Sequence, residues 1–239
     1  MHTLLDLRGS ITANIHITDG ICHDSNELDN LIPEPFAFYV MDKAYVDFEA
    51  LFRFHRSQAF WVSRPKENMK FTTVWQLEIP EAKSDIIEDS LIRVTGYKSR
   101  KLYPEDMRFV QVYDPGNDTI VDFISNNFEV SALEISILYR QRWNIEVFFK
   151  WIKQNIAVKT LWGFSENTGK IHLWAAIISY LTIARIKSDC GSCYYITEVA
   201  TPIRISALES VELRQLITKQ DSSINSNQNV KELSLFDDL

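Results

Sequence analysis

The stretch YRQRWNIEVFFKWIKQN, Tyr139–Asn155, is typical of one amphipathic helix with an unusual polar face. At about 100° per residue, four polar side chains fall within about 60° of one another. They are Tyr139, Arg142, Glu146 and Lys153. Nearly every other direction is apolar or aromatic, which is typical of a buried helix. We therefore expect the polar stripe to face a cleft.

Two interpretations of the lone acid are open from the pattern. Arg142 and Glu146 are four residues apart and could form a helical ion pair. Alternatively, Glu146 binds a divalent cation, because a carboxylate in apolar surroundings needs a cation or another partner. Mg²⁺ prefers such oxygen ligands, and the basic side chains and Tyr139 would then hold phosphate.

A second carboxylate, Asp42, directly follows the apolar run FAFYVM, Phe36–Met41. This run has the length of a central strand buried on both faces. Sites in open α/β sheets form at the carboxyl ends of strands, so Asp42 is a candidate metal ligand. Together with Glu146 it would be consistent with two-metal phosphoryl transfer. The alternative is that Asp42 only caps the helix expected from Val46.

The order of apolar runs predicts an α/β fold, because strand, helix and strand follow one another from Phe36 to Arg64. A β-hairpin is expected before them, over residues 2–18. Helices are expected at about 132–155, 166–187 and 203–218. We expect four parts, namely an N-terminal part of the catalytic domain (1–66), an antiparallel β-rich insertion (67–128), a C-terminal helical part with the Glu146 helix (129–218) and a mobile tail (219–239).

Composition favours a globular protein of the cytoplasm. The chain has 239 residues, of which 46% are hydrophobic, and its three cysteines do not suggest a disulfide framework. Cys190 and Cys193 form a C-x-x-C motif without the second pair that a zinc site needs. The longest apolar run, Ile171–Ile186, is shorter than the roughly 20 residues of a membrane span.

The net charge of −7 disfavours a nucleic-acid binder on average. Basic residues nevertheless cluster within 93–108 and 139–170.

The spacing of Tyr139, Arg142, Glu146 and Lys153 resembles the Y-R-E-K signature of bacterial insertion-sequence transposases of the DDE class. The segment VMDKAYVDFEALFRFHRSQAFWVSRPK, Val40–Lys66, is similar to the region around that family's second catalytic aspartate. The resemblance implies an RNase H-like mixed sheet with helices, interrupted by the β-rich insertion.

The resemblance also implies roles for individual residues. Asp42 and Glu146 would bind Mg²⁺ or Mn²⁺, while Tyr139, Arg142 and Lys153 would contact phosphates of the transposon end. The reaction would free a 3′-OH at the end of the element, and this hydroxyl would then attack target DNA. The implied partners are DNA and a second copy of the chain in a homodimer. The implied location is the bacterial cytoplasm, with nucleoid association when DNA is bound.

The first aspartate of the family lies on a strand upstream of the hairpin with which this chain begins. We therefore expect the first strand of the fold to be missing and cleavage by this chain to be weak or absent. Asp6 lies inside a strand, and Asp19 and Asp24 have turn and cap contexts, so none of the three is expected to replace it. The alternatives are a non-catalytic DNA-binding or regulatory remnant that interferes with the full-length enzyme, and another RNase H-like nuclease.

Overall fold

The computed structural model describes residues 2–8, 11–17, 28–79, 85–155, 165–192 and 194–206. The described residues fall into two compact units. The sheet unit is built mainly from Ile17–Arg142, and the helical unit combines Thr3–His16 with Trp143–Lys231, as far as these segments are described.

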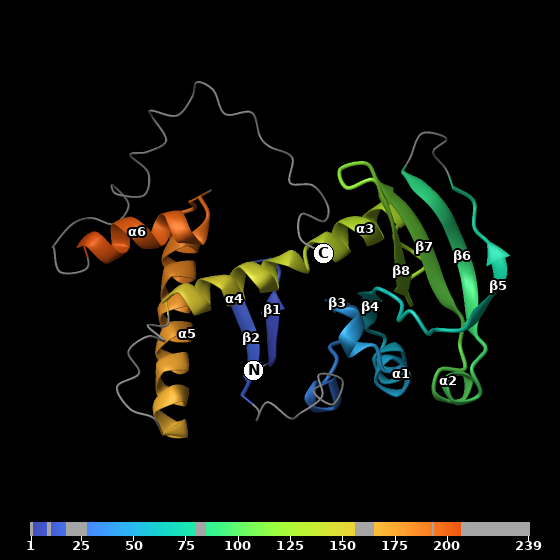
Figure 1. Ribbon diagram of the computed structural model, residues 1–239, viewed down its shortest axis with the longest axis horizontal. Helices are drawn as coiled ribbons and strands as arrows, with labels where there is room; N and C mark the ends of the chain where they lie inside the picture. Colours follow the sequence, from blue (N-terminus) through green and yellow to red (C-terminus); the bar gives the residue numbers. More distant parts are fainter. Residues whose placement is uncertain are drawn as a thin grey trace. The chain divides into compact units, whose positions relative to one another are not determined.

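The sheet unit contains six strands in the order β3-β4-β8-β7-β6-β5. Their bounds are Phe38–Val40 (β3), Phe60–Ser63 (β4), Phe71–Gln76 (β5), Ile86–Val94 (β6), Met107–Asp114 (β7) and Thr119–Ser125 (β8). β3 and β4 run parallel, and the remaining neighbours are antiparallel. Figure 1 shows that the long antiparallel strands form a curved sheet. This mixed α/β sheet confirms the predicted fold class and is consistent with an RNase H-like domain.

The parallel pair is connected by a helix, as α/β folds require for a crossover. This helix, α1 (Phe48–Arg56), follows a single 3-10 turn, η2 (Lys43–Tyr45). Asp47 caps α1, because its carboxylate accepts the backbone N–H groups of Glu49 and Ala50, each at 3.0 Å. Leu51 and Phe54 are fully buried on the inner face of α1. The helix expected from Val46 and the strand expected to end at Arg64 are thus confirmed as α1 and β4.

The segment expected as an insertion continues the sheet of β3 and β4. β8 pairs with β4, with Val62 opposite Ser125, so β5–β8 extend one sheet outward. A short helix, α2 (Tyr97–Leu102), lies between β6 and β7, where the sequence indicated only β structure.

The prediction of a central strand over Phe36–Met41 is wrong in two respects. β3 stands at the end of the strand order within the described sheet, and it has three residues. The backbone of Phe36 adopts a φ of 64°, and its side chain is 69% exposed. A left-handed residue cannot continue an extended strand, so pairing begins only at Phe38.

Helix α3 (Ala132–Arg140) packs its buried face on the sheet (Figure 1). Ile135 and Tyr139 join a cluster of sheet residues that includes Val62, Val110 and Phe123. α3 begins with a capping box, in which Ser131 and Glu134 satisfy each other's backbone N–H groups. The helix start predicted at about residue 132 is thus confirmed.

The predicted single helix over 132–155 is wrong, because it is divided into α3 and α4 (Trp143–Asn155). Gln141 and Arg142 form the turn between them, and the Arg142 N–H donates to the carbonyl of Tyr139 at 2.9 Å. The helical wheel drawn through Tyr139 and Lys153 therefore joins residues of two different helices.

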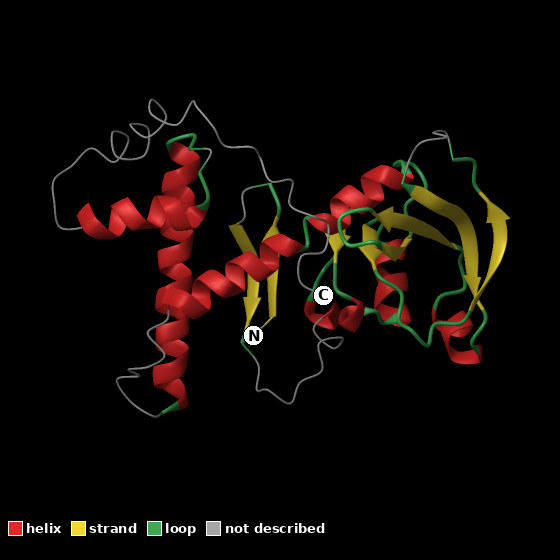
Figure 2. Cartoon of the chain, turned by 45° about the horizontal axis from the view of Figure 1, so that its top comes forward, coloured by secondary structure: helices red, strands yellow, loops and turns green. Residues whose placement is uncertain are grey.

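The helical unit combines a β-hairpin with three helices (Figure 2). The hairpin consists of β1 (His2–Asp6) and β2 (Ile11–His16), as predicted, and α5 (Glu166–Asp189) contacts β2, α4 and α6 (Ile196–Ser206). Phe148 and Trp151 of α4 pack edge-on against Tyr180 of α5, with ring centroids 4.8 and 5.3 Å apart. The expected tail lies outside the described residues, as does much of the last predicted helix. Within the described part, no helix has the length and apolarity needed to cross a bilayer.

Candidate metal and DNA site

Asp42 lies just beyond the carboxyl end of β3, where the sequence predicted it. Met41 still donates its N–H to Val62 of β4 at 3.0 Å, so the backbone is fixed up to the residue before the carboxylate. Oδ1 of Asp42 accepts the Ala44 N–H at 2.9 Å and thereby caps η2. The alternative that Asp42 caps the helix expected from Val46 is wrong, because that helix, α1, has its own cap in Asp47, whereas Asp42 caps η2.

The second oxygen of Asp42 faces a guanidinium group. Arg142 Nη1 lies 4.0 Å from Oδ2 of Asp42, at the edge of ion-pair distance. The Asp42 side chain is 45% exposed and that of Arg142 is 19% exposed. The Asp42 carboxylate is thus partly exposed, and a positive charge lies close beside its Oδ2.

Tyr139 contributes its ring to the core and its hydroxyl to the neighbourhood of the carboxylate. The residue is 4% exposed, and its ring centroid lies 5.0 Å from that of Phe123. The guanidinium carbon of Arg142 lies 5.7 Å from the same tyrosine ring. Burial raises the pKa of Tyr139, and the positive charge of Arg142 opposes this rise. Any contact of Tyr139 with a ligand would therefore be made by a neutral hydroxyl group.

Glu146 and Lys153 belong to α4 in the helical unit. Glu146 lies half-buried in the first turn of α4, and Lys153 is exposed in the last turn. Arg142 directly precedes α4, so it lies outside the helix that carries Glu146. The structure therefore brings Asp42, Arg142 and Tyr139 together in the sheet unit and places Glu146 and Lys153 on one helix of the other unit.

Carboxylate oxygens are suitable ligands for a hard cation, and Mg²⁺ is usually bound by one or two carboxylates together with water and substrate phosphates. The partly exposed carboxylate of Asp42 fits this chemistry. No cluster of three or more His, Cys, Asp and Glu side chains suited to a metal ion occurs in the described ranges.

Asp6, which was not expected to be a ligand, forms a fork-like pair with Arg8. The Arg8 Nε–Oδ1 and Nη2–Oδ2 distances are 3.1 and 2.7 Å, and these hydrogen bonds lower the pKa of Asp6. Asp19, Asp24 and Cys193 lie outside the described residues, and Cys190 caps the end of α5.

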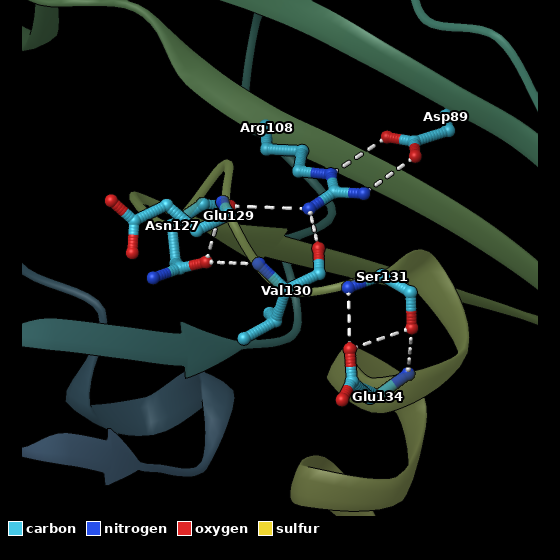
Figure 3. Close-up of polar contacts among 7 residues, drawn as sticks. All are labelled: Asp89, Arg108, Asn127, Glu129, Val130, Ser131 and Glu134. Atoms are coloured by element: carbon cyan, nitrogen blue, oxygen red, sulfur yellow. Dashed lines mark hydrogen bonds and ion pairs between the residues drawn. The ribbon is translucent and has the colours of Figure 1, made fainter.

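One member of the basic sequence run has a structural role that sequence reasoning missed. Arg108 is 5% exposed and forms two hydrogen bonds with Asp89, at 2.8 and 2.6 Å (Figure 3). It also donates to the backbone carbonyls of Asn127 and Val130, in the connection between β8 and α3. Arg108 is therefore engaged inside the fold and holds the segment from which the helix of Tyr139 begins. An arginine and an aspartate on adjacent β-prone runs were the only sequence signal for this pair.

Known proteins similar to this chain are transposases. Residues 1–181 match the family described as transposase DDE domain. A putative transposase of Sinorhizobium fredii is 32% identical over 183 residues, which cover 75% of this chain and 51% of that protein. A probable transposase for an insertion sequence element of Geobacillus stearothermophilus is 28% identical over 183 residues, covering 77% and 48%.

A putative insertion-sequence transposase of a Synechocystis strain is 26% identical over 187 residues, covering 75% of this chain and 50% of that protein. The chain thus spans about half the length of the curated relatives it matches. The family match covers well over half of the chain, and it agrees with the mixed sheet. The chain belongs to the transposase DDE domain family.

Proposed function

We propose that Asp42 and Glu146 are metal-binding carboxylates of a DNA transposase that cuts the ends of a mobile element and joins them to target DNA. The observation that carries the proposal is the position of Asp42. It follows a paired strand, one of its oxygens is held by the Ala44 N–H, the other lies 4.0 Å from Arg142, and the side chain is partly exposed. Membership of the transposase DDE domain family supports the same reaction class.

The two carboxylates are assigned to the cation, and the basic side chains and Tyr139 are assigned to phosphate. Asp42 and Glu146 would hold Mg²⁺ or Mn²⁺, and water and DNA phosphate oxygens would complete the coordination. When bound, the metal supplies Lewis-acid stabilisation of the attacking and leaving oxygens of phosphoryl transfer.

Phosphate is bound by the basic side chains and the tyrosine hydroxyl. Arg142 presents a planar fork that matches phosphate oxygens, whereas Lys153 acts as an exposed point charge. Tyr139 is held by its buried ring, so its hydroxyl would donate from a fixed position. A fixed donor loses little conformational entropy when phosphate binds.

The partners of this reaction are the ends of the element, the target DNA and a second copy of the chain. Two ends must be handled together for strand transfer, which favours a homodimer. We place this activity in the bacterial cytoplasm, where the DNA lies.

The test uses the full chain and a supercoiled plasmid that carries the genomic DNA flanking its coding sequence on both sides. The nicked product is expected to be weak, in keeping with the weak cleavage predicted from the sequence, and to form with Mg²⁺ but not with EDTA. Asp42→Asn and Glu146→Gln should each remove the products. Asp118→Asn, in the exposed β7–β8 turn, is the matched control and should cleave normally. Cleavage that persists in Asp42→Asn would show that the assignment is wrong.

A further inference from the structure

The short helix α2 carries a concentrated positive charge outside the site of Asp42. Its sequence is YKSRKL, and Lys98, Arg100 and Lys101 are all exposed. No acidic residue occurs between positions 90 and 104, although the chain as a whole has a net charge of −7. The surface of α2 therefore has the opposite sign to the average of the molecule.

The described part of the sheet unit offers these charges no compensating acid. Arg93, on the preceding strand, is already bound to Asp106 at 2.6 and 2.9 Å. By contrast, no described carboxylate lies within ion-pair distance of Lys98, Arg100 or Lys101. The ammonium group of Lys101 instead lies 5.8 Å from the centre of the Tyr97 ring. The tyrosine is 83% exposed, so an aromatic ring and its hydroxyl lie on the same basic surface.

The basic helix is firmly attached to the fold. Tyr103, the residue after α2, is fully buried and packs its ring against Trp61 and Phe52, with centroid distances of 6.0 and 5.4 Å. Its hydroxyl lies 2.7 Å from Nδ1 of His55. The last turn of α1, which includes His55 and the exposed Arg56, thus meets the end of α2. A fixed surface of this kind can bind a polyanion at little ordering cost.

We infer that α2, together with the last turn of α1, binds the phosphate backbone of duplex DNA. Six helical residues extend over about 9 Å. Duplex DNA carries one negative charge per ~1.7 Å of its axis, so a surface of this length meets several phosphates. Lysine and arginine neutralise these charges, and the Tyr97 hydroxyl can donate to a phosphate oxygen, as tyrosine commonly does at DNA backbones. Such contacts position the duplex without reading its sequence. The inference rests on the proposed function, since it supplies that function with a second DNA contact.

The test measures binding of the full chain to a fluorescent duplex of arbitrary sequence by anisotropy, in EDTA and over a series of salt concentrations. Lys98→Ala/Lys101→Ala should lower the slope of log affinity against log salt by about 2, because each lost phosphate contact removes about 0.9. Its affinity in 0.1 M salt should fall roughly tenfold or more. Lys98→Arg/Lys101→Arg keeps both charges and should bind as the wild type does.

The matched control is Lys170→Ala/Arg185→Ala, which removes two exposed positive charges from α5 and gives the same net charge. An equal loss of affinity in both double variants would overturn the inference, because net charge would then explain it. Displacement of the duplex by polyglutamate at the same charge concentration would also overturn it, since the surface would then favour acidic polypeptides equally.

Failure of the inference and failure of the proposed function give different results. Nicking of the plasmid with unchanged duplex affinity in Lys98→Ala/Lys101→Ala would overturn only the α2 inference. Salt-dependent binding that weakens in this variant, without any metal-dependent nicking by the wild type, would overturn only the proposed function.

Discussion

Arg142 Nη1 lies 4.0 Å from Oδ2 of Asp42, while the other oxygen of the same carboxylate accepts the Ala44 N–H at 2.9 Å. The backbone hydrogen bond fixes the direction of the carboxylate, and the arginine is close enough to influence any charge that binds there. This arrangement suits a site that must hold both a cation and a phosphate, because each ligand moderates the charge that the other meets.

Replacing Arg142 by Gln should separate metal binding from DNA cleavage. At about 6 Å in water, two unit positive charges repel each other by about 0.7 kcal/mol. A divalent ion doubles this repulsion, so Mn²⁺ affinity, followed by electron paramagnetic resonance, should rise about tenfold. Plasmid nicking should fall at least roughly tenfold, because the phosphate loses its planar donor. Weaker Mn²⁺ binding together with weaker nicking would instead indicate that Arg142 only supports the fold.

Tyr139 should show separate effects of its ring and its hydroxyl. Tyr139→Phe keeps the contact with Phe123, so stability should change little, while nicking should decrease through loss of one phosphate donor. Tyr139→Ala should destabilise the chain by about 3–5 kcal/mol, as large-to-small changes of buried aromatic residues do. Urea unfolding and plasmid nicking measure the two quantities. Unchanged nicking in Tyr139→Phe would contradict the assigned phosphate contact.

The buried pair of Arg108 and Asp89 should be required for stability as a pair. Arg108→Met leaves Asp89 without its cation, which should cost about 3–5 kcal/mol in urea unfolding. Arg108→Met/Asp89→Leu removes both charges and should regain a large part of this loss. The matched comparison is Arg93→Met, at the more exposed pair with Asp106, which should have a small effect. A double variant no more stable than Arg108→Met would show that the hydrogen bonds of Arg108 to the β8–α3 connection matter more than the charge pair.

The start of α3 gives a pH prediction. The pKa of Glu134 is lowered because its carboxylate accepts hydrogen bonds from the backbone and side chain of Ser131. A carboxylate with a lowered folded-state pKa adds stability above its unfolded pKa, and this stability is lost as the pH falls through the folded value. Ser131→Ala keeps the backbone hydrogen bond and loses that of the hydroxyl, so the Glu134 pKa should rise part of the way toward its ordinary value, as measured by NMR titration. An unchanged pKa would mean that the capping box does not persist in solution.

Local sequence patterns were sufficient to predict the strands and several helices. Continuous β-prone runs such as Phe71–Gln76 and Met107–Asp114 form strands. The helix expected from Val46 begins at Phe48, directly after its cap Asp47. The position of Asp42 after an apolar run was also predictable, because it depends on residues adjacent in sequence.

Features that depend on distant parts of the chain were not predictable in this way. The turn at Gln141 contains neither glycine nor proline, so no local signal marks the end of α3. β3 is brought to the end of the described strand order by pairing with β4 only, which no local pattern determines. Arg108 resembled a surface base because its partner Asp89 lies on a neighbouring strand. The sequence signature groups Tyr139 with Lys153, whereas the structure shows that they belong to separate helices.

The proposal that Asp42 and Glu146 are both metal ligands can be tested by iron-directed hydroxyl-radical cleavage of the full chain. Fe²⁺ with ascorbate cuts a polypeptide close to where the metal is bound, and mass spectrometry locates the cuts. Cuts are expected near both Asp42 and Glu146, suppressed by excess Mg²⁺ and retained in Asp118→Asn. The cut near Asp42 should disappear in Asp42→Asn, and the cut near Glu146 should disappear in Glu146→Gln. A cut near Asp42 that persists in Asp42→Asn, or no cut near either residue in the wild type, would contradict the assignment.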